Sequence, residues 1–330
     1  MIAYQPVHKT LSSSVVCMSA LMLFCGTESA TAQSYPVRPI RMLIQFSPGG
    51  APDLIARTLG SKLTESWGQP VIVDSRPGAG GNLAVEIAAR SPPDGYTLIV
   101  VSPTIVINPS LYRGVSWDPI RDFAPLALAG TLPNMLMVHP SVPARTVKEL
   151  IGLAKARPGQ LNYSTSGVGT SVHLAAELFK AMSGTNIVHV PYKGGSQAMM
   201  AVISGEVPLT FGSASALTQV RAGKLIAVAM TTRKRWAGLP QVPTIAESGL
   251  PGYEVVNWFG VLAPRATPAE VTTRLSHELI RVLKLSDVQE RFGRESIDAS
   301  MISSEEFGAY MRSEMAKWAK VIQAIGVRVE

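Results

Sequence analysis

Cysteine is almost missing from this chain. Its 330 residues include two cysteines, Cys17 and Cys25, and both lie near the N-terminus. The sequence after residue 25 therefore excludes a disulfide framework, a metal–thiolate site and a cysteine nucleophile.

Long apolar runs and concentrated charge are missing as well. No stretch reaches the roughly 18 uninterrupted apolar residues of a membrane-spanning helix. The formal net charge of +7 is scattered, and the one compact basic run, Arg233-Lys234-Arg235, lacks interleaved aromatic residues. We therefore expect a soluble protein that binds no nucleic acid.

Common signatures of cofactor and metal sites are also absent. The patterns HExxH and GxxxxGK[ST] do not occur, and Gly78-Ala79-Gly80 fails to complete GxGxxG because Leu83 occupies the final position. We expect no metal, no cofactor and no enzymatic activity.

The N-terminal segment predicts export. Lys9 precedes a mostly apolar run over residues 15–24, and Ala30-Thr31-Ala32 has the small-x-small form of a signal-peptidase site. We predict a signal peptide over residues 1–32, cleavage after Ala32 and a periplasmic mature chain. Phe24 stands where a lipoprotein signal needs a small residue before its cysteine, which argues against lipidation of Cys25.

Beyond this segment, strand-like and helix-like patterns alternate. Such alternation predicts an α/β fold with mostly parallel sheet, and 330 residues suffice for two domains of about 100–200 residues each. The expected strands cover residues 42–44, 71–73, 96–101, 135–138, 161–164, 187–190, 207–211 and 225–230; the clearest helices cover 147–157, 171–182, 268–285 and 303–325.

Residues 40–57 predict a strand, a glycine-rich turn and a helix start. The apolar run at 42–44 ends at Ser47-Pro48-Gly49-Gly50, and Pro52 suits the first helical position. The apolar residues Ile55, Leu59, Leu63 and Trp67 would then line one helix face. Backbone amides at such a start attract anions, although an ordinary strand–helix connection would have the same pattern.

Residues 161–179 show the same order of a strand, a glycine-containing turn and a helix start. Gly167 and Gly169 free the turn, and Thr170 or Ser171 can cap the helix that follows. Ligands of open α/β sheets gather at the carboxyl ends of strands, so two domains that each offer such an end across a cleft would form one site.

Seven motifs in order give a more specific resemblance. They are FSPGGAPD (46–53), DSRPGAGGN (74–82), PDGYTL (93–98), NPSLY (108–112), STSGVGTSVHLAAELF (164–179), VPYKGG (190–195) and RAGKL (221–225). Together they resemble the Bug family of extracytoplasmic solute receptors, the substrate-binding subunits of tripartite tricarboxylate transporters.

This resemblance implies a two-domain, type II (Venus flytrap) periplasmic binding protein with its ligand cleft between the domains. Domain 1 would comprise residues 33–134 and 252–330, and domain 2 residues 135–251. The expected ligand is a small organic acid, a carboxylate or an amino acid, and the expected partners of this monomer are inner-membrane transporter subunits.

The resemblance also implies which residues bind the ligand, largely through backbone amides, hydroxyls and ordered waters. They are Phe46, Ser47, Gly49, Gly50, Asp53, Ser102, Thr104, Ser164, Gly167, Gly169, Thr170, Ser171, His173, Tyr192 and Ser213. The chain departs from the family pattern at Ala84, Ala201, Pro208 and Gly212-Ser213, which leaves the identity of the ligand open.

Two of these residues have alternative interpretations. Asp53 either complements the positive end of its own helix or meets a water, a hydroxyl or an ammonium group of the ligand. His173 either caps and packs its helix or contacts the ligand directly.

Two other functions fit the same chain. A ligand sensor that docks on a membrane signalling protein would use the same fold and cleft. A periplasmic serine hydrolase would need Ser47, Ser166, Ser171 or Ser196 beside a histidine base, but Gly194-Gly195-Ser196-Gln197-Ala198 lacks the last glycine of Gly-x-Ser-x-Gly.

Overall fold

The computed structural model describes residues 1–5, 35–192 and 194–326. The predicted signal peptide, its cleavage site and both cysteines lie outside these residues. All helices and strands named below belong to one compact unit that begins at Arg38. In the described ranges, no helix is both long enough and apolar enough to cross a bilayer.

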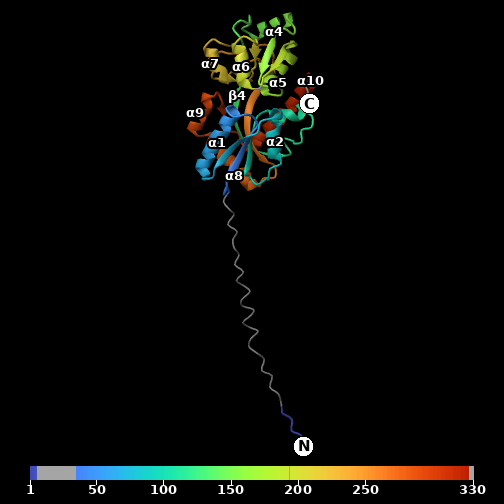
Figure 1. Cartoon of the computed structure of the whole chain (residues 1–330), viewed down its shortest axis with the longest axis vertical. Coiled ribbons are helices and arrows are strands. Elements are labelled where there is room, and N and C mark those ends of the chain that lie inside the picture. The colour runs from blue at the N-terminus through green and yellow to red at the C-terminus, as the bar shows by residue number, and fades with distance from the viewer. Residues whose placement is uncertain (6–34, 193, 327–330) are drawn as a thin grey trace. The chain divides into compact units, whose positions relative to one another are not determined.

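One six-stranded sheet organises the part of this unit that we call lobe 1 (Figure 1). Its strand order is β11-β4-β10-β3-β1-β2. The strands are β1 (Ile40–Ile44), β2 (Val71–Ser75), β3 (Thr97–Val101), β4 (Phe123–Pro133), β10 (Val256–Pro264) and β11 (Asp298–Ala299). The helices of lobe 1 are α1 (Ala51–Trp67), α2 (Asn82–Ala89), α3 (Thr104–Leu111), α8 (Ala269–Leu283), α9 (Ser286–Arg294) and α10 (Ser304–Ile325), with a short 3-10 turn at Ala79–Gly81.

A second, five-stranded sheet organises lobe 2, which carries α4 to α7 in the upper part of Figure 1. Its strand order is β7-β6-β8-β5-β9. The strands are β5 (Met135–Val138), β6 (Asn162–Thr165), β7 (Val188–Pro191), β8 (Leu209–Thr210) and β9 (Ile226–Met230). The helices are α4 (Val147–Ala156), α5 (Ser171–Ser183), α6 (Gly195–Ile203) and α7 (Leu217–Arg221), with a 3-10 turn at Ala214–Ala216.

All eight strands expected from the sequence are present, and the four helix predictions are also confirmed. The expectation of mostly parallel sheet was wrong. Pairs β1–β2, β1–β3, β6–β7 and β6–β8 are parallel, whereas every pair that includes β4, β5, β10 or β11 is antiparallel. The long strands β4 and β10 escaped prediction because both are almost continuously buried and show no alternation of polar and apolar residues.

The chain crosses between the two sheets twice. Asn134 links β4 to β5, and residues 231–255 link β9 to β10. Thr231 joins the two crossings, because its hydroxyl donates to the carbonyls of Asn134 (3.1 Å) and Val255 (2.7 Å). The domain boundaries at 134/135 and 251/252 stay a prediction.

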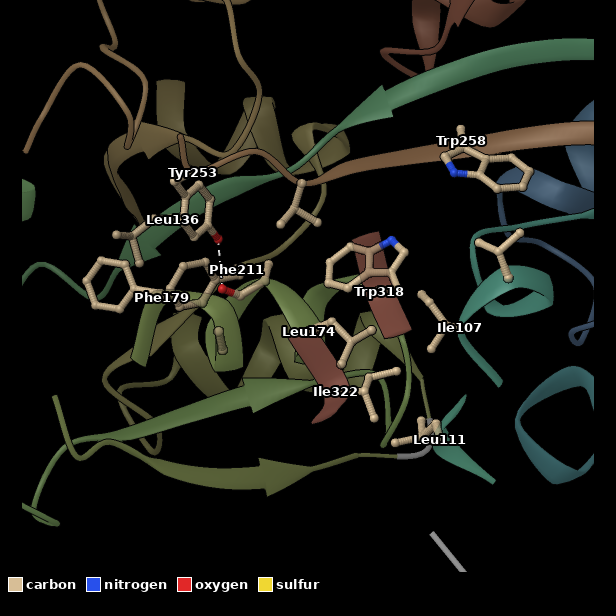
Figure 2. Packing of buried hydrophobic residues seen from close by; sticks show 14 of the residues in the cluster. Ile107, Leu111, Leu136, Leu174, Phe179, Phe211, Tyr253, Trp258, Trp318 and Ile322 are labelled. Atoms are coloured by element: carbon tan, nitrogen blue, oxygen red, sulfur yellow. Dashed lines mark hydrogen bonds between the residues drawn. The ribbon is translucent and has the colours of Figure 1, made fainter. Parts of the chain in front are cut away.

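Helix α10 packs against both lobes. Figure 2 shows Trp318 and Ile322 of α10 beside Leu174 of α5, with Ile107 and Leu111 of α3 nearby, and all five side chains are buried. This apolar cluster continues from lobe 1 into lobe 2, so the two sheets share one core along α10.

Candidate functional site

The first glycine-rich loop joins β1 to α1. Its residues 47–50 are exposed, Gly49 has a φ of +92° and the extended Gly50 precedes Ala51, the first residue of the helix. Pro52 is therefore the second helical residue, one position later than predicted. Ile55, Leu59 and Leu63 are buried as predicted, so their packing determines where the loop lies.

Asp53 closes this first loop. Its Oδ2 accepts a hydrogen bond from the Gly49 N–H at 3.0 Å, and its Oδ1 lies 2.9 Å from Nε of Arg57. The residue is 7% exposed. Because Gly49 donates its amide within the loop, the first-turn amide that remains for a ligand is that of Ala51, which has no intrahelical acceptor.

Behind this loop, Gln45 connects the ends of two neighbouring strands. The backbone N–H of Ser102 donates to Gln45 Oε1 at 2.8 Å, and the hydroxyls of Ser102 and Thr104 lie 3.2 and 3.3 Å from the same oxygen. These three side chains are buried. Strands β1 and β3 are parallel neighbours, so the loops that leave their carboxyl ends meet here.

The second glycine-rich loop joins β6 to α5. Thr170 caps the helix, as predicted: its hydroxyl accepts from the His173 N–H at 3.4 Å and donates to the Gly167 carbonyl at 2.8 Å. The Gly169 N–H donates to His173 Nδ1 at 3.2 Å. The amides of Ser171 and Val172 are left in the first helical turn without an intrahelical acceptor.

His173 is a buried, neutral side chain. Its ring lies 4.3 Å from the ring of His189, and burial, with a smaller contribution from the charge of His189, lowers its pKa to about 4. Because Nδ1 accepts from a backbone N–H, the ring proton is on Nε2. This geometry matches the capping and packing interpretation of His173.

The structure brings the second loop into contact with lobe 1. A Cβ atom added to Gly169 would lie 2.6 Å from Leu111 Cδ2 and 3.7 Å from Asn108 Oδ1, both on α3. Helix α3 begins at Thr104, which also contacts Gln45. Helix α3 therefore contacts the second loop through Asn108 and Leu111, and the end of β1 through Thr104.

Other predicted site residues use their polar groups within one lobe. The Ser164 hydroxyl donates to the Ala198 carbonyl, and Tyr192 donates to Glu206. The Ser213 hydroxyl accepts from the Ser215 N–H. In lobe 1, the Phe46 carbonyl accepts from the Ser75 hydroxyl, and Ser47 is exposed. Their contact with a ligand stays a prediction.

Sequence reasoning missed two residues of this region, Gln45 and Asn108. Gln45 ends an otherwise apolar strand, and a polar residue at the carboxyl end of a buried strand was a usable signal. Asn108 lies inside the motif NPSLY, but only the fold places it against the second loop.

Two cavities are lined by residues outside these loops, although the second is bordered by Leu111, which contacts Gly169. One, of about 360 Å³, is lined by residues of α8, α10 and the segment before β4; the other, of about 490 Å³, lies between the C-terminal ends of α3 and α10. Among the described residues, no three His, Cys, Asp or Glu side chains are grouped so that they could hold a metal ion.

The family model described as "Tripartite tricarboxylate transporter family receptor" (TctC) matches residues 55–327. Protein BugT of Bordetella pertussis is 32% identical over 91% of this chain and 93% of its own length. Among solved structures, Rpa4515 of R. palustris with adipate is 36% identical (TM-score 0.82; 89% of this chain, 99% of that one). MatC of Rhodopseudomonas palustris with bound malate is 28% identical (TM-score 0.78; 87% and 100%).

These matches agree with the two α/β lobes described above. The chain has the two-domain α/β fold of periplasmic binding proteins and belongs to the TctC, or Bug, family of tripartite tricarboxylate transporter receptors.

Proposed function

We propose that this protein is a periplasmic receptor that binds a small organic carboxylate between its two lobes and delivers it to the membrane subunits of a tripartite tricarboxylate-type transporter. One observation carries the proposal: the glycine-rich loop of lobe 2 lies against α3, the helix that begins beside Gln45 and Ser102 in lobe 1. The solved relatives with adipate and malate support a carboxylate as the ligand class.

The ligand carboxylate would be held by first-turn amides of α1 and α5. Micromolar affinity requires about 8 kcal/mol, and each helix N-terminus contributes at most about 2 kcal/mol. Hydrogen bonds to a charged group add about 1.5–3 kcal/mol each before the cost of association. The affinity therefore depends on several bonds from both lobes at once, which requires the lobes to close on the ligand.

The hydrogen bonds and the low pKa of the histidines near the loops argue against a serine hydrolase. In the part of the chain that the structure describes, Ser47, Ser166, Ser171 and Ser196 make no hydrogen bond to a histidine side chain. Nδ1 of His173 is occupied by a backbone amide, and a pKa of about 4 makes its ring a weak base.

A sensory role would use the same cleft and differs only in the membrane partner. Deletion of the gene followed by measurement of acid uptake and of the transcriptional response separates the two. Unchanged uptake with a lost transcriptional response would favour the sensor.

Ala51→Pro tests the cleft directly. Proline is favoured in the first helical turn, so the substitution removes one amide donor at little cost to folding. We expect isothermal titration of the mature protein with mono-, di- and tricarboxylates to find a ligand, and Ala51→Pro to weaken its binding by about 10- to 100-fold.

Ala269→Pro is the matched control, because Ala269 is the first residue of α8, outside the two loops. It should leave affinity unchanged. If no organic acid binds the native protein, the proposed function is wrong; if both variants bind equally well, the Ala51 amide does not hold the carboxylate.

A further inference from the structure

The positive charge of this protein is concentrated in lobe 2. Residues 135–251 contain 11 of the 30 Lys and Arg residues but 4 of the 23 Asp and Glu residues, which gives this lobe a formal net charge of +7. The rest of the chain contains 19 residues of each sign and has no net charge. The excess that is scattered along the sequence therefore belongs to one lobe. Such an asymmetry orients a protein in the field of a charged partner.

The strand directions define the outer end of lobe 2. Val138 ends β5 and pairs with Leu209 and Ile226, which begin β8 and β9. Asn162 and Val188, which begin β6 and β7, pair with each other. Because β5 enters the lobe at the crossing from lobe 1, this end of the sheet is the one farther from lobe 1. Helix α4 joins β5 to β6 across it, at the top of Figure 1. We call residues 139–161, 182–188, 204–208 and 222–225 the lobe 2 tip.

Exposed basic side chains gather at this tip. Lys148, in the first turn of α4, and Lys155, in its last turn, lie two turns apart on one face of the helix. A lysine in the first turn meets the positive end of the helix dipole, so helix stability does not explain Lys148. The other basic residues of the tip are Arg145 before α4, Arg157 after it and Lys224 before β9.

These cations are not neutralised within the part of the chain that the structure describes, where the five tip residues form no ion pair. All four carboxylates of lobe 2 already have other partners: Glu149 the backbone N–H groups of residues 145 and 146, Glu177 the ammonium of Lys180, Glu206 the hydroxyl of Tyr192, and Glu247 the guanidinium of Arg235. The tip therefore presents positive charge to whatever approaches it.

Two exposed apolar side chains lie at the same tip. Met182, near the end of α5, is 37% exposed, and Val188, at the start of β7, is 42% exposed. In the turn between them, the Asn186 carbonyl accepts a hydrogen bond from the Gly159 N–H at 2.8 Å. Gly159 follows Arg157 by two residues, so this bond joins the apolar turn to the basic one. Cations and apolar side chains thus share one surface.

We propose that the lobe 2 tip binds the surface of an anionic phospholipid membrane. Phosphodiester headgroups form a layer of negative charge that attracts exposed lysine and arginine residues, and exposed apolar side chains enter the boundary below it. Neither cavity described above includes a residue of the tip, which fits a layer of like charges better than a single anionic group. The contact goes beyond the proposed function, because it holds the receptor at a membrane whichever acid it carries.

An acidic protein surface is the alternative partner. Protein–protein interfaces are commonly anchored by buried aromatic side chains, and the tip contains no Phe, Tyr or Trp. Electrostatic attraction to headgroups requires exposed basic residues alone. The composition of the tip therefore favours the membrane.

Co-sedimentation of the mature protein with vesicles tests the proposal. We expect binding to vesicles that contain phosphatidylglycerol and none to vesicles of phosphatidylcholine alone. Binding should weaken as salt is added, because the screening length falls from about 10 Å at 0.1 M to about 3 Å at 1 M. The triple variant Lys148→Gln, Lys155→Gln and Lys224→Gln should bind the anionic vesicles at least about tenfold more weakly.

The matched control is the triple variant Arg274→Gln, Lys284→Gln and Arg291→Gln, which removes three exposed basic residues of lobe 1 and changes the net charge equally. It should bind the anionic vesicles within about twofold of the native protein. Equal weakening in the two variants would overturn the proposal. Equal binding of the native protein to both kinds of vesicle, or no binding to the anionic ones, would overturn it as well.

The same variants separate this proposal from the proposed function. The tip lies at the opposite end of β6 from the second loop, so the lobe 2 variant should bind organic acids with native affinity in calorimetry. A tip that fails to bind vesicles would therefore leave carboxylate binding intact.

Discussion

At the scale of single residues, a cluster of buried and half-buried polar side chains supports the second loop. Its members are Tyr163, His173, Glu177, Lys180 and His189. Glu177 accepts from Tyr163 Oη at 2.5 Å and from Lys180 Nζ at 2.7 Å. Burial raises the pKa of the Glu177 carboxyl, but these hydrogen bonds lower it further, and the net pKa is below its ordinary value. Burial lowers the pKa of both histidines, so this cluster holds neutral rings beside one paired carboxylate.

His173 should make stability depend on pH. Its pKa is about 4 in the folded protein and 6.5 when unperturbed, so between these values only the unfolded chain takes up the proton. The free energy of unfolding should therefore decrease as the pH falls from 6.5 to 4, by roughly 3 kcal/mol for this one group. Urea unfolding at pH 7 and pH 4.5 measures this loss.

His173→Asn is the matched variant, because an asparagine oxygen can accept the Gly169 N–H and does not titrate. Its loss of stability between pH 7 and 4.5 should be smaller than that of the native protein. Equal losses in both proteins would show that other groups cause the acid sensitivity.

At the scale of elements, the start of α5 requires glycine for two reasons. Gly169 has a φ of +81°, which disfavours any side chain, and it packs against Leu111 on α3. Gly184, at the other end of α5, shares the positive φ (+63°) but has no atom within 4 Å of an added Cβ. Substitution of Gly184 therefore measures the cost of backbone strain alone, whereas substitution of Gly169 measures that strain together with the lost fit between the second loop and α3.

We therefore expect different results from alanine at the two positions. Gly184→Ala should cost about 1 kcal/mol of stability and leave ligand affinity unchanged. Gly169→Ala should cost about 1–3 kcal/mol more and weaken ligand binding, because the new methyl group displaces the second loop from α3. Chemical unfolding and calorimetry measure the two effects, and equal affinities of the two variants would contradict this account.

At the scale of the whole molecule, the two chain crossings between the sheets are joined at Thr231. Thr231 is fully buried and its hydroxyl bonds Asn134 and Val255, one residue from each crossing. The Thr231 N–H also donates to Asn134, and the Val255 N–H donates to the Thr231 carbonyl. The crossings are therefore bonded to each other as well as to their sheets.

Thr231→Val should loosen this junction. Loss of the hydroxyl leaves two carbonyls with one bond fewer, which should cost about 1 kcal/mol and speed hydrogen exchange of the Val255 amide. Thr210→Val removes a comparable hydroxyl bond, to the Ser164 carbonyl inside lobe 2. This control should lose similar stability without faster exchange at Val255; similar exchange in both variants would argue against a special role of Thr231.

Much of the local structure was predictable because it depends on neighbouring residues. Glycine and proline mark the start of α1, Thr170 marks the start of α5, and short apolar runs mark eight strands. Strands β4 and β10 were not predictable in this way, because a strand buried on both faces has no period-2 pattern. Their antiparallel pairing makes the sheet of lobe 1 mixed, and the antiparallel strand β5 does the same in lobe 2.

The sequence by itself determined the α/β alternation, the two glycine-rich helix starts and, through its ordered motifs, the family. These follow from backbone preferences and hydrophobic periodicity over a few residues. Only the tertiary structure decided that Gln45 bonds Ser102, that Gly169 lies against α3, and that buried oxygens of Asp53 and Asn108 have no hydrogen-bond partner. Such facts depend on contacts between residues far apart in the chain, and no local pattern specifies which side chains those contacts satisfy.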